Sequence, residues 1–257
     1  MPYKILQPGE PAGAAGGCCA LAVMAKAPRA GKVKTRLSPP LTPDQAAQLN
    51  ICFIRDTTEN IHQVTGGSNS AGIVVYTPVG DEAAFDDLLP PGFLLLGQRG
   101  DGFGERLIHA CEDLFACGFS AVCLIDSDSP TMPQAVLLEA VDWLSRPGDR
   151  VVLGGSDDGG YYLIGVKRMH RRLFEQIDWS TERVFHQTLE RAKEIELRAE
   201  LLPAWYDVDD AVTLERLRQE LAGPKAAGSE AAGYDARHTR LFLGGLRVDV
   251  VGQSRAC

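Results

Sequence analysis

The chain has 257 residues, of which 45% are hydrophobic and 23% charged, and its formal net charge is −8. This size and composition suit an α/β domain with a full core and exclude a disordered, collagen-like or disulfide-scaffolded chain. The acidic balance argues against nucleic acid or an anionic membrane as the main partner. The longest apolar run, residues 18–25, is too short to span a bilayer.

The seven cysteines give no sign of a metal site or of secretion. Most lie inside apolar runs, as Cys52, Cys111 and Cys123 do, which is typical of reduced core residues. The sequence has no C-x-x-C pair and its five histidines are scattered, so we expect no zinc site. The glycine- and proline-containing start also does not resemble a signal peptide, and we expect a cytoplasmic protein.

The hydrophobic pattern predicts short strands that alternate with helices. Residues 1–19, rich in Gly, Ala and Pro, are expected to form a flexible leader. Apolar runs predict strands at 20–25, 72–76, 93–96, 120–125, 151–153, 161–166 and 195–202. Helices are expected at about 42–64, 104–117, 133–144, 181–193 and 210–221. This alternation over residues 20–221 predicts a mostly parallel sheet with helices on both faces.

Three helix caps can be suggested from the sequence. Thr42 precedes Pro43 and Gln45, which predicts a capping box with proline at the first helical position. Thr131 is a candidate cap for the helix at 133–144, and Ser180 or Thr181 for the helix that reaches residue 193.

The last 36 residues differ in character from the rest. Residues 222–235 are linker-like, whereas 241–251 have the apolar, β-branched content of a strand. We expect this extension to add an edge strand or to contact a second subunit of a homo-oligomer.

The loop after the first strand is the clearest candidate site. No acidic residue lies between Glu10 and Asp44, yet five cations fall within eleven residues: Lys26, Arg29, Lys32, Lys34 and Arg36. In doubly wound sheets ligands bind beyond the carboxyl ends of the strands, and fixed cations with free backbone N–H groups suit a di- or triphosphate. Gly31 would let the backbone approach the phosphates. The alternative is a solvated basic turn; a Walker A loop is excluded because Val33 follows Lys32.

Two groups of acids are candidates for metal binding. Asp126 and Asp128 end an apolar strand, where carboxylates can hold Mg²⁺ or Mn²⁺ together with donor phosphates and water. Asp207, Asp209 and Asp210 precede the last helix, and Asp209 is the one we expect to complete the site. The alternatives are an Asx turn for the first group and a helix N-cap for the second.

Two glycine-rich segments predict backbone held close to a ligand. One runs from Gly154 to Tyr162 and contains Asp158, and the other runs from Gln98 to Arg106. A tight hairpin is the alternative for the first. Neither matches the G-x-S-x-G elbow or the dinucleotide fingerprint.

Taken in order, these blocks resemble the DUF2064 group, also called the rSAM/selenodomain-associated transferase 1 family. The motifs are K-x-P-x-x-G-x-x-K-T-R-L at 26–37, Q-x-G-D-x-x-G-E-R at 98–106, D-S-P at 128–130, D-G-G-Y-Y-L-I-G at 158–165, D-W-S-T at 178–181 and D-V-D at 207–209. The resemblance covers about residues 20–221. It implies a glycosyltransferase-A-like fold of the nucleotide-diphospho-sugar transferase superfamily, a three-layer α/β/α sandwich with a mixed sheet.

The resemblance also implies a divalent metal near Asp128 and a phosphate or nucleotide near Lys26, Lys34 and Arg36. The family pattern has a small residue where this chain has Asp126, which makes Asp128 the safer ligand. The extension after residue 222 lies outside the match.

We therefore expect a transferase that uses a nucleotide-activated donor with Mg²⁺ or Mn²⁺. Glycosyl transfer from a nucleotide-diphospho-sugar is the first interpretation, with Asp158 as the base. Nucleotidyl transfer with release of pyrophosphate is the alternative, and a non-catalytic nucleotide-binding protein is the second alternative. The expected acceptor pocket comprises Gln98, Asp101, Glu105, Arg106, Tyr161 and Trp179.

Overall fold

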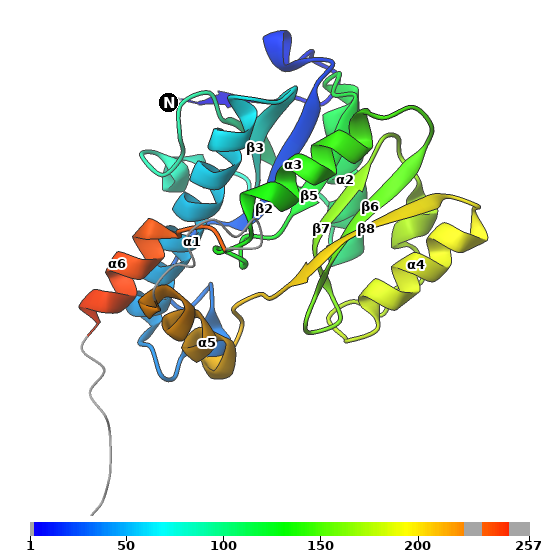
Figure 1. Ribbon diagram of the computed structural model, residues 1–257. Coiled ribbons are helices and arrows are strands. Elements are labelled where there is room, and N and C mark those ends of the chain that lie inside the picture. Colours follow the sequence, from blue (N-terminus) through cyan, green and yellow to red (C-terminus); the bar gives the residue numbers. More distant parts are fainter. Residues whose placement is uncertain (1–2, 224–232, 247–257) are drawn as a thin grey trace, which may run out of the picture.

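The computed structural model describes residues 3–223 and 233–246, and its core is one mixed sheet of eight strands (Figure 1). The strands lie in the order β1-β4-β3-β2-β5-β7-β6-β8. Only β7 runs antiparallel to its neighbours, β5 and β6. The strands are β1 (Lys4–Ile5), β2 (Cys19–Lys26), β3 (Ser70–Thr77), β4 (Leu94–Gly97), β5 (Ala121–Ile125), β6 (Arg150–Ser156), β7 (Tyr161–Val166) and β8 (Arg198–Trp205). The predicted mostly parallel mixed sheet is confirmed.

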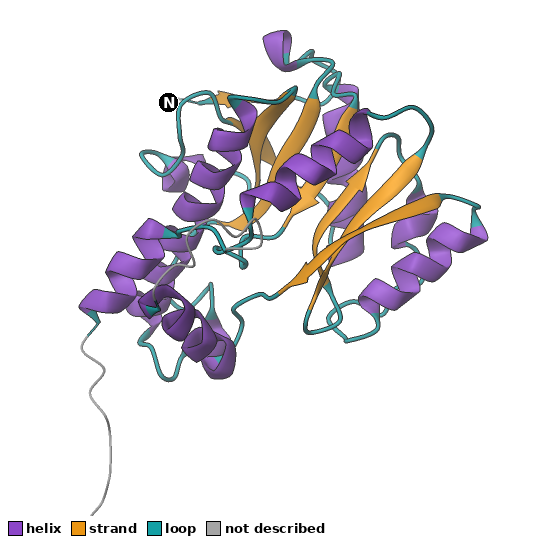
Figure 2. Cartoon of the chain, in the orientation of Figure 1, coloured by secondary structure: helices purple, strands orange, loops and turns teal. Residues whose placement is uncertain are grey.

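Helices cover both faces of this sheet (Figure 2). The described α-helices are α1 (Pro43–Thr65), α2 (Phe103–Ala116), α3 (Gln134–Ser145), α4 (Val184–Glu194), α5 (Ala211–Ala222) and α6 (Arg237–Gly245). Because side chains alternate along a strand, Leu21 and Val23 of β2 pack in one core with α1 and α3, and Ala20 and Ala22 in a second core with α2. The result is the expected three-layer α/β/α architecture.

The first helix begins as its sequence predicts. The Thr42 Oγ1 accepts from the Gln45 N–H at 3.2 Å, and the Gln45 Oε1 accepts from the Thr42 N–H at 2.8 Å, which closes a capping box. Pro43 occupies the first helical position. The other two predicted caps are wrong. Pro133 precedes α3, and Arg183 precedes α4, with no side-chain cap bond at either.

The sheet register determines where the candidate site lies. In the parallel pair of β2 and β5, Val23 lies beside Ile125. Both strands therefore end at the same edge of the sheet. Lys26 is the last residue of β2, and Asp126 directly follows β5. The basic loop and the first pair of acids meet there.

A third core cluster closes the molecule beside this edge. Leu37 lies in a short 3-10 helix, Thr35–Leu37, and packs with Leu49 and Phe53 of α1 and with Leu214 of α5. Helices α5 and α6 lie side by side next to α1 (Figure 1). The basic loop is thus held from behind by apolar contacts.

The two chain ends differ from expectation. The segment predicted as a flexible leader contributes β1, which pairs with β4, and buries Leu6 and Ala12 in the core. Residues 237–245 form α6, which takes in the first five residues of the predicted strand 241–251, because Phe242 and Leu243 pack against the third cluster as helical neighbours. The remainder of the predicted strand, 247–251, and most of the predicted linker lie outside the described residues.

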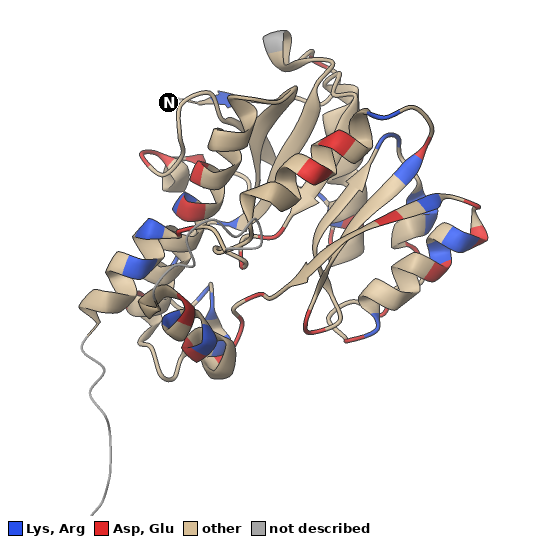
Figure 3. Ribbon diagram, in the orientation of Figure 1, with Lys and Arg blue, Asp and Glu red and all other residues tan. Residues whose placement is uncertain are grey.

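Charged residues of both signs are distributed along the helices and loops, as on α4 and α5 (Figure 3). No described helix is both long and apolar enough to cross a membrane.

Candidate functional site

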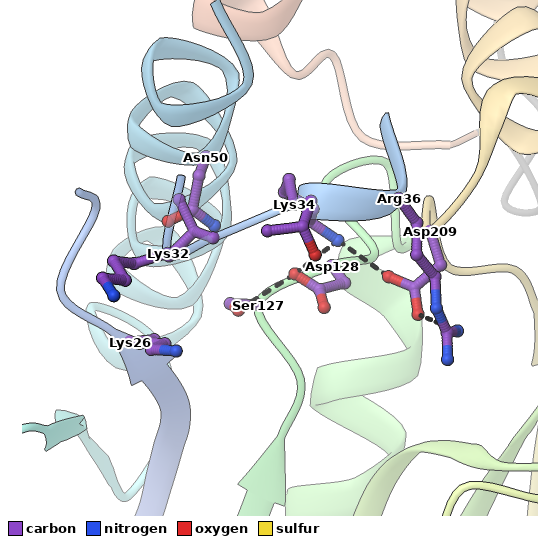
Figure 4. Close-up of a pocket in the computed structure, with 10 residues that line it drawn as sticks. Lys26, Lys32, Lys34, Arg36, Asn50, Ser127, Asp128 and Asp209 are labelled. Carbon is purple, nitrogen blue, oxygen red and sulfur yellow. Dashed lines mark hydrogen bonds and ion pairs between the residues drawn. The ribbon is translucent and has the colours of Figure 1, made fainter. Parts of the chain in front are cut away.

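A cavity of about 260 Å³ opens where β2 and β5 end. Basic and acidic side chains face each other across it (Figure 4). Four cations line it, together with Asn50, Ser127 and two carboxylates: Lys26, Lys32, Lys34, Arg36, Asp128 and Asp209. The structure thus brings together Lys26, Lys34, Arg36, Asp128 and Asp209 from the predicted site.

Lys34 lies at the centre of this arrangement. Its Nζ is 2.8 Å from Asp128 Oδ1 and 3.0 Å from Asp209 Oδ1, and it donates to the Val208 carbonyl at 2.7 Å. Its side chain is only 5% exposed. Burial disfavours the ammonium, but the charges of Asp128 and Asp209 outweigh burial and hold the pKa of Lys34 above its ordinary value. Lys34 is therefore a fixed cation.

The backbone at Lys34 is in the left-handed region, with φ 48°. A non-glycine residue seldom adopts this conformation without support from its surroundings. Here it directs the side chain inward to the two carboxylates, while the next residues form the short 3-10 helix.

The acids before α5 have three different partners. Asp210 caps the helix, and its Oδ1 accepts from the N–H groups of Val212 and Thr213. Asp209 faces Lys34 and also lies 3.9 Å from Arg36. Asp207 accepts from the Ser156 hydroxyl at 2.9 Å. The cap interpretation is therefore confirmed for Asp210, which leaves Asp209 directed into the cavity.

Asp126 lies behind the cavity rather than on its wall. Its Oδ2 accepts from the Ser129 hydroxyl at 2.9 Å, whereas its buried Oδ1 has no partner among the described residues. Burial, and then the charge of Asp128, raises the pKa of Asp126 well above its ordinary value. In the free protein, the ionised form of the Asp126 carboxyl is therefore disfavoured, which makes Asp126 a poor metal ligand.

The carboxylates of Asp128 and Asp209 converge on a cation, which here is the Lys34 ammonium. Hard oxygen ligands of this kind suit Mg²⁺ or Mn²⁺, and Mg²⁺ is commonly held by one or two carboxylates with substrate phosphates and water. The predicted trio of Asp126, Asp128 and Asp209 does not bring three ligand atoms within 4.8 Å of one another in the described chain. The residues present fit a metal that arrives with the donor better than a preformed three-carboxylate site.

Three side chains elsewhere do meet that spacing: Asp56, Glu59 and His238. Asp56 accepts from the N–H groups of His238 and Thr239 at 2.9 and 2.8 Å and so caps α6. Glu59 lies 2.8 Å from His238 Nε2. These contacts join α1 to α6, and we interpret the group as a structural joint.

Two predicted phosphate ligands, Arg29 and Gly31, are not among the described residues that line this cavity. Arg29 pairs with Asp81 and does not line the cavity. Gly31 has φ 71°, a conformation that favours glycine, but no atom lies within 4 Å of where its Cβ would be. Its positive φ shapes the turn, and its approach to a phosphate stays a prediction.

A second cavity of about 470 Å³ adjoins the first, because Arg36 and Asp209 line both. Asp158, Tyr161 and Trp179 line it, as predicted, together with Phe103 and Glu182. The Trp179 ring meets Phe103 at 77° and Tyr161 at 82°, with centroids 5.3 and 6.5 Å apart. This cavity therefore combines aromatic walls with carboxylates.

The other predicted acceptor residues support their own loop instead. Glu105 accepts from the N–H groups of Asp101 and Gly102 at the start of α2. Arg106 donates to the Gly100 carbonyl, and Gln98 to the Val75 carbonyl. None of these four side chains is among the described residues lining the second cavity. The loop contributes Phe103.

Close packing of two glycines fixes the second cavity. A Cβ on Gly104 would lie 2.5 Å from Trp179 Nε1, and a Cβ on Gly159 would lie 2.2 Å from the Glu182 carbonyl oxygen. Gly159 also has φ 87°. Only glycine at position 104 lets the Trp179 indole pack against the start of α2. Only glycine at position 159 lets the 156–160 turn pack on the 178–182 segment.

Sequence reasoning missed several lining residues. Asn50 lies in α1 between Leu49 and Phe53, is 4% exposed, and its buried Oδ1 has no partner among the described residues. A polar residue on the apolar face of a helix was the available signal. Phe103 and Glu182 gave no such signal, because an aromatic and an acid at a helix start are ordinary.

Comparison with known proteins agrees with this architecture. The family model described as "Uncharacterized protein conserved in bacteria (DUF2064)" matches residues 60–181. A "putative nucleotide-diphospho-sugar transferase" from Desulfovibrio desulfuricans G20 is similar in crystal structure, with 27% identity, a TM-score of 0.73 and coverage of 87% of this chain and 97% of that one. The resemblance to the DUF2064 family is confirmed.

More distant structures share the fold. CMP:2-keto-3-deoxy-manno-octonic acid synthetase complexed with CTP has a TM-score of 0.51, 14% identity, and coverage of 80% of this chain and 99% of that one. 4-Diphosphocytidyl-2C-methyl-D-erythritol synthase from Anaerococcus prevotii DSM 20548 has a TM-score of 0.53, 9% identity, and coverage of 81% and 97%. No curated protein matches the chain significantly.

Proposed function

We propose that the protein is a transferase that binds the phosphates of a nucleotide-activated donor in the cation-lined cavity and passes a group to an acceptor in the adjoining aromatic cavity. The observation that carries this proposal is the pairing of Lys34 and Arg36 with Asp128 and Asp209 in one cavity at the carboxyl ends of β2 and β5. Ligands of doubly wound sheets bind at this edge.

The donor's phosphates would lie against Lys26, Lys32 and Arg36. Lys34 is already paired with two carboxylates, whereas Arg36 is 76% exposed and its one ion-pair contact among the described residues is the 3.9 Å contact with Asp209. An exposed guanidinium can turn to bind a phosphate in bidentate fashion. Asn50 offers a further polar contact, because its side-chain oxygen lacks a partner among the described residues.

A divalent metal, Mg²⁺ or Mn²⁺, would be held by Asp128, with help from Asp209. When bound it would neutralise charge on the leaving phosphate. Lys34 would then share these carboxylates with the metal or turn toward the phosphates. Asp126 would not be a direct ligand, because its pKa is raised and it is not among the residues that line the cavity.

Glycosyl transfer is the first form of this proposal. The bond between the sugar's anomeric carbon and the phosphate oxygen breaks, a new bond forms to the acceptor oxygen, and the nucleoside diphosphate leaves. Asp158 lines the acceptor cavity, and its Oδ1 is held by the Gly160 N–H at 2.8 Å. Its carboxylate would take the acceptor's proton. The relative from Desulfovibrio supports this form through its description as a nucleotide-diphospho-sugar transferase.

Nucleotidyl transfer is the second form, and the number of cations in the first cavity favours it. Four cationic side chains line that cavity, which suits a triphosphate better than a diphosphate. Here the acceptor oxygen would attack the α-phosphorus and pyrophosphate would leave.

Product analysis separates the two forms. The purified protein is incubated with Mg²⁺, a panel of nucleotide sugars and nucleoside triphosphates, and a mixture of sugar, polyol and amine acceptors. Glycosyl transfer releases a nucleoside diphosphate, whereas nucleotidyl transfer releases pyrophosphate. Nucleotide binding without either product would support a non-catalytic nucleotide-binding protein instead, and absence of binding to every nucleotide would contradict the proposal.

A further inference from the structure

The two adjoining cavities have opposite charge. The first is lined by four cationic side chains and two carboxylates, and the second by three carboxylates, Asp158, Glu182 and Asp209, and one guanidinium, Arg36. Arg36 and Asp209 lie at the boundary and belong to both. Beyond that boundary, the second cavity has only carboxylates as charged groups.

Asp209 is paired with Lys34 and Arg36, whereas the described residues do not neutralise Asp158 and Glu182. Within residues 3–223 and 233–246, neither Asp158 nor Glu182 has an ion-pair partner, and Asp158 accepts only the Gly160 N–H. The negative field of Asp158 and Glu182, beside low-dielectric aromatic walls, repels anionic molecules from the cavity.

The aromatic walls favour a ring with polar edges. Phe103 is 52% exposed although it is a large apolar residue, so a free aromatic face lies at the cavity wall. The Trp179 indole N–H has no partner among the described residues. Stacking on aromatic faces, with hydroxyl or ammonium groups donating to carboxylates, is a common way of binding a polar ring.

From this charge division we propose that the acceptor is a hydroxyl-bearing molecule without phosphate or carboxylate groups, and that Glu182 is the residue that excludes anionic acceptors. The inference rests on the proposed function, because it assumes that the first cavity takes the donor's phosphates. The division of charge would keep the two substrates in their own cavities: the phosphorylated donor is drawn to one and rejected by the other.

The field in the second cavity can be measured without knowing the acceptor. Trp179 lines this cavity, whereas Trp143 lies under Arg146 and Trp205 is stacked on Tyr206. Quenching of tryptophan fluorescence by iodide and by caesium is compared in the wild-type protein and in Trp179→Phe, at matched ionic strength. The difference between the two proteins gives the quenching of Trp179, and each quencher is normalised to N-acetyltryptophanamide.

We expect caesium to quench Trp179 about threefold more efficiently than iodide after normalisation. The cavity carboxylates attract the caesium cation and repel the iodide anion, and salt screens charges at this short range only partly. Glu182→Gln should move this ratio toward one. Glu190→Gln, which removes an exposed carboxylate on α4 outside the cavity, should leave it unchanged. Equal or stronger quenching by iodide in the wild-type protein would overturn the inference.

Binding of matched sugars gives the second readout, with glucose, glucosamine and glucose 6-phosphate as probes of Trp179 fluorescence. Tighter binding of glucose 6-phosphate than of glucose would overturn the inference, and at least tenfold weaker binding would support it. Nucleotide-dependent thermal stabilisation is recorded on the same samples. Absence of nucleotide-dependent stabilisation in the wild-type protein would count against the proposed function. Nucleotide-dependent stabilisation together with tighter binding of glucose 6-phosphate than of glucose would count against this inference alone.

Discussion

Lys34 connects the basic loop to the acidic side chains of the proposed donor site. It is almost fully buried and holds Asp128 and Asp209 at 2.8 and 3.0 Å. Lys34→Met would leave Asp128 without its counter-ion and Asp209 with only the 3.9 Å contact to Arg36 among the described residues. We expect a loss of about 1–3 kcal/mol in the free energy of unfolding, measured by urea denaturation, because breaking a buried ion pair strands its charges.

The same variant should weaken binding of every phosphorylated donor, whatever its base. A matched control is Lys193→Met, which removes a lysine in the last turn of α4. If Lys34→Met and Lys193→Met bind nucleotides equally well, Lys34 has no role in the donor site.

Gly104 is the residue on which the position of Trp179 depends. A Cβ at this position would lie 2.5 Å from the indole nitrogen. Gly104→Ala should therefore displace Trp179 and reduce acceptor-dependent turnover at least tenfold, while nucleotide binding measured by calorimetry stays within about twofold.

Gly102→Ala is the matched control, because no atom lies within 4 Å of its Cβ position and its φ is negative. It should cost only the modest N-cap preference of glycine over alanine, roughly 0.5–1 kcal/mol. Equal loss of turnover in the two variants would show that Trp179 is not positioned by this contact.

At the scale of elements, one buried carboxylate of α1 makes the central contact with the start of α6. Asp56 is fully buried and accepts two N–H groups at the start of α6. Asp56→Asn would set an amide N–H₂ against these donors, and we expect a loss of about 1–3 kcal/mol. Tryptic cleavage at Arg237 and Arg240 should become faster. Glu59→Gln removes only a half-exposed partner of His238 and should change cleavage little; similar acceleration by both variants would contradict the assigned role of Asp56.

A second joint links the turn before β6 to the segment after β7. Burial alone would raise the pKa of Asp149, but Arg168 and His170 outweigh burial and lower it. Since a lowered pKa means that the folded state binds fewer protons, this stabilisation is present above pH 4 and is lost as pH falls through the folded-state pKa. Wild-type protein should therefore lose more stability than Asp149→Asn between about pH 5 and 2. Parallel curves of unfolding free energy against pH would contradict this.

At the scale of the whole molecule, most of the sheet and its helices could be predicted because the central strands, such as β2, β3 and β5, contain continuous apolar runs and α1 carries its own capping signals. The C-terminal extension could not. Its apolar content suits a strand, but Phe242 and Leu243 instead pack as one face of a helix beside α1 and α5. That outcome depends on a cap supplied by Asp56, about 180 residues earlier in the chain, which no local pattern reveals.

The proposed donor cavity was more predictable from the sequence than the proposed acceptor cavity. Lys34, Arg36, Asp128 and Asp209 converge because each follows or precedes a recognisable element. In the 98–106 loop, by contrast, Glu105 and Arg106 form hydrogen bonds with backbone groups of the same loop, and Phe103 lines the cavity. Local hydrogen bonds of this kind cannot be told from ligand contacts in a sequence alone.

Thermal unfolding with nucleotide donors, with Mg²⁺ or with a chelator, in wild-type protein and Asp128→Asn, tests the central claim most directly. At donor concentrations near 100 times the dissociation constant, linkage predicts about 2.7 kcal/mol of stabilisation, or roughly 5–10 °C for a chain of this size. We predict that chelation removes most of this shift in wild-type protein and that Asp128→Asn shows a small shift that Mg²⁺ does not change. A full shift that survives both chelation and Asp128→Asn would contradict a metal-assisted donor site at Asp128.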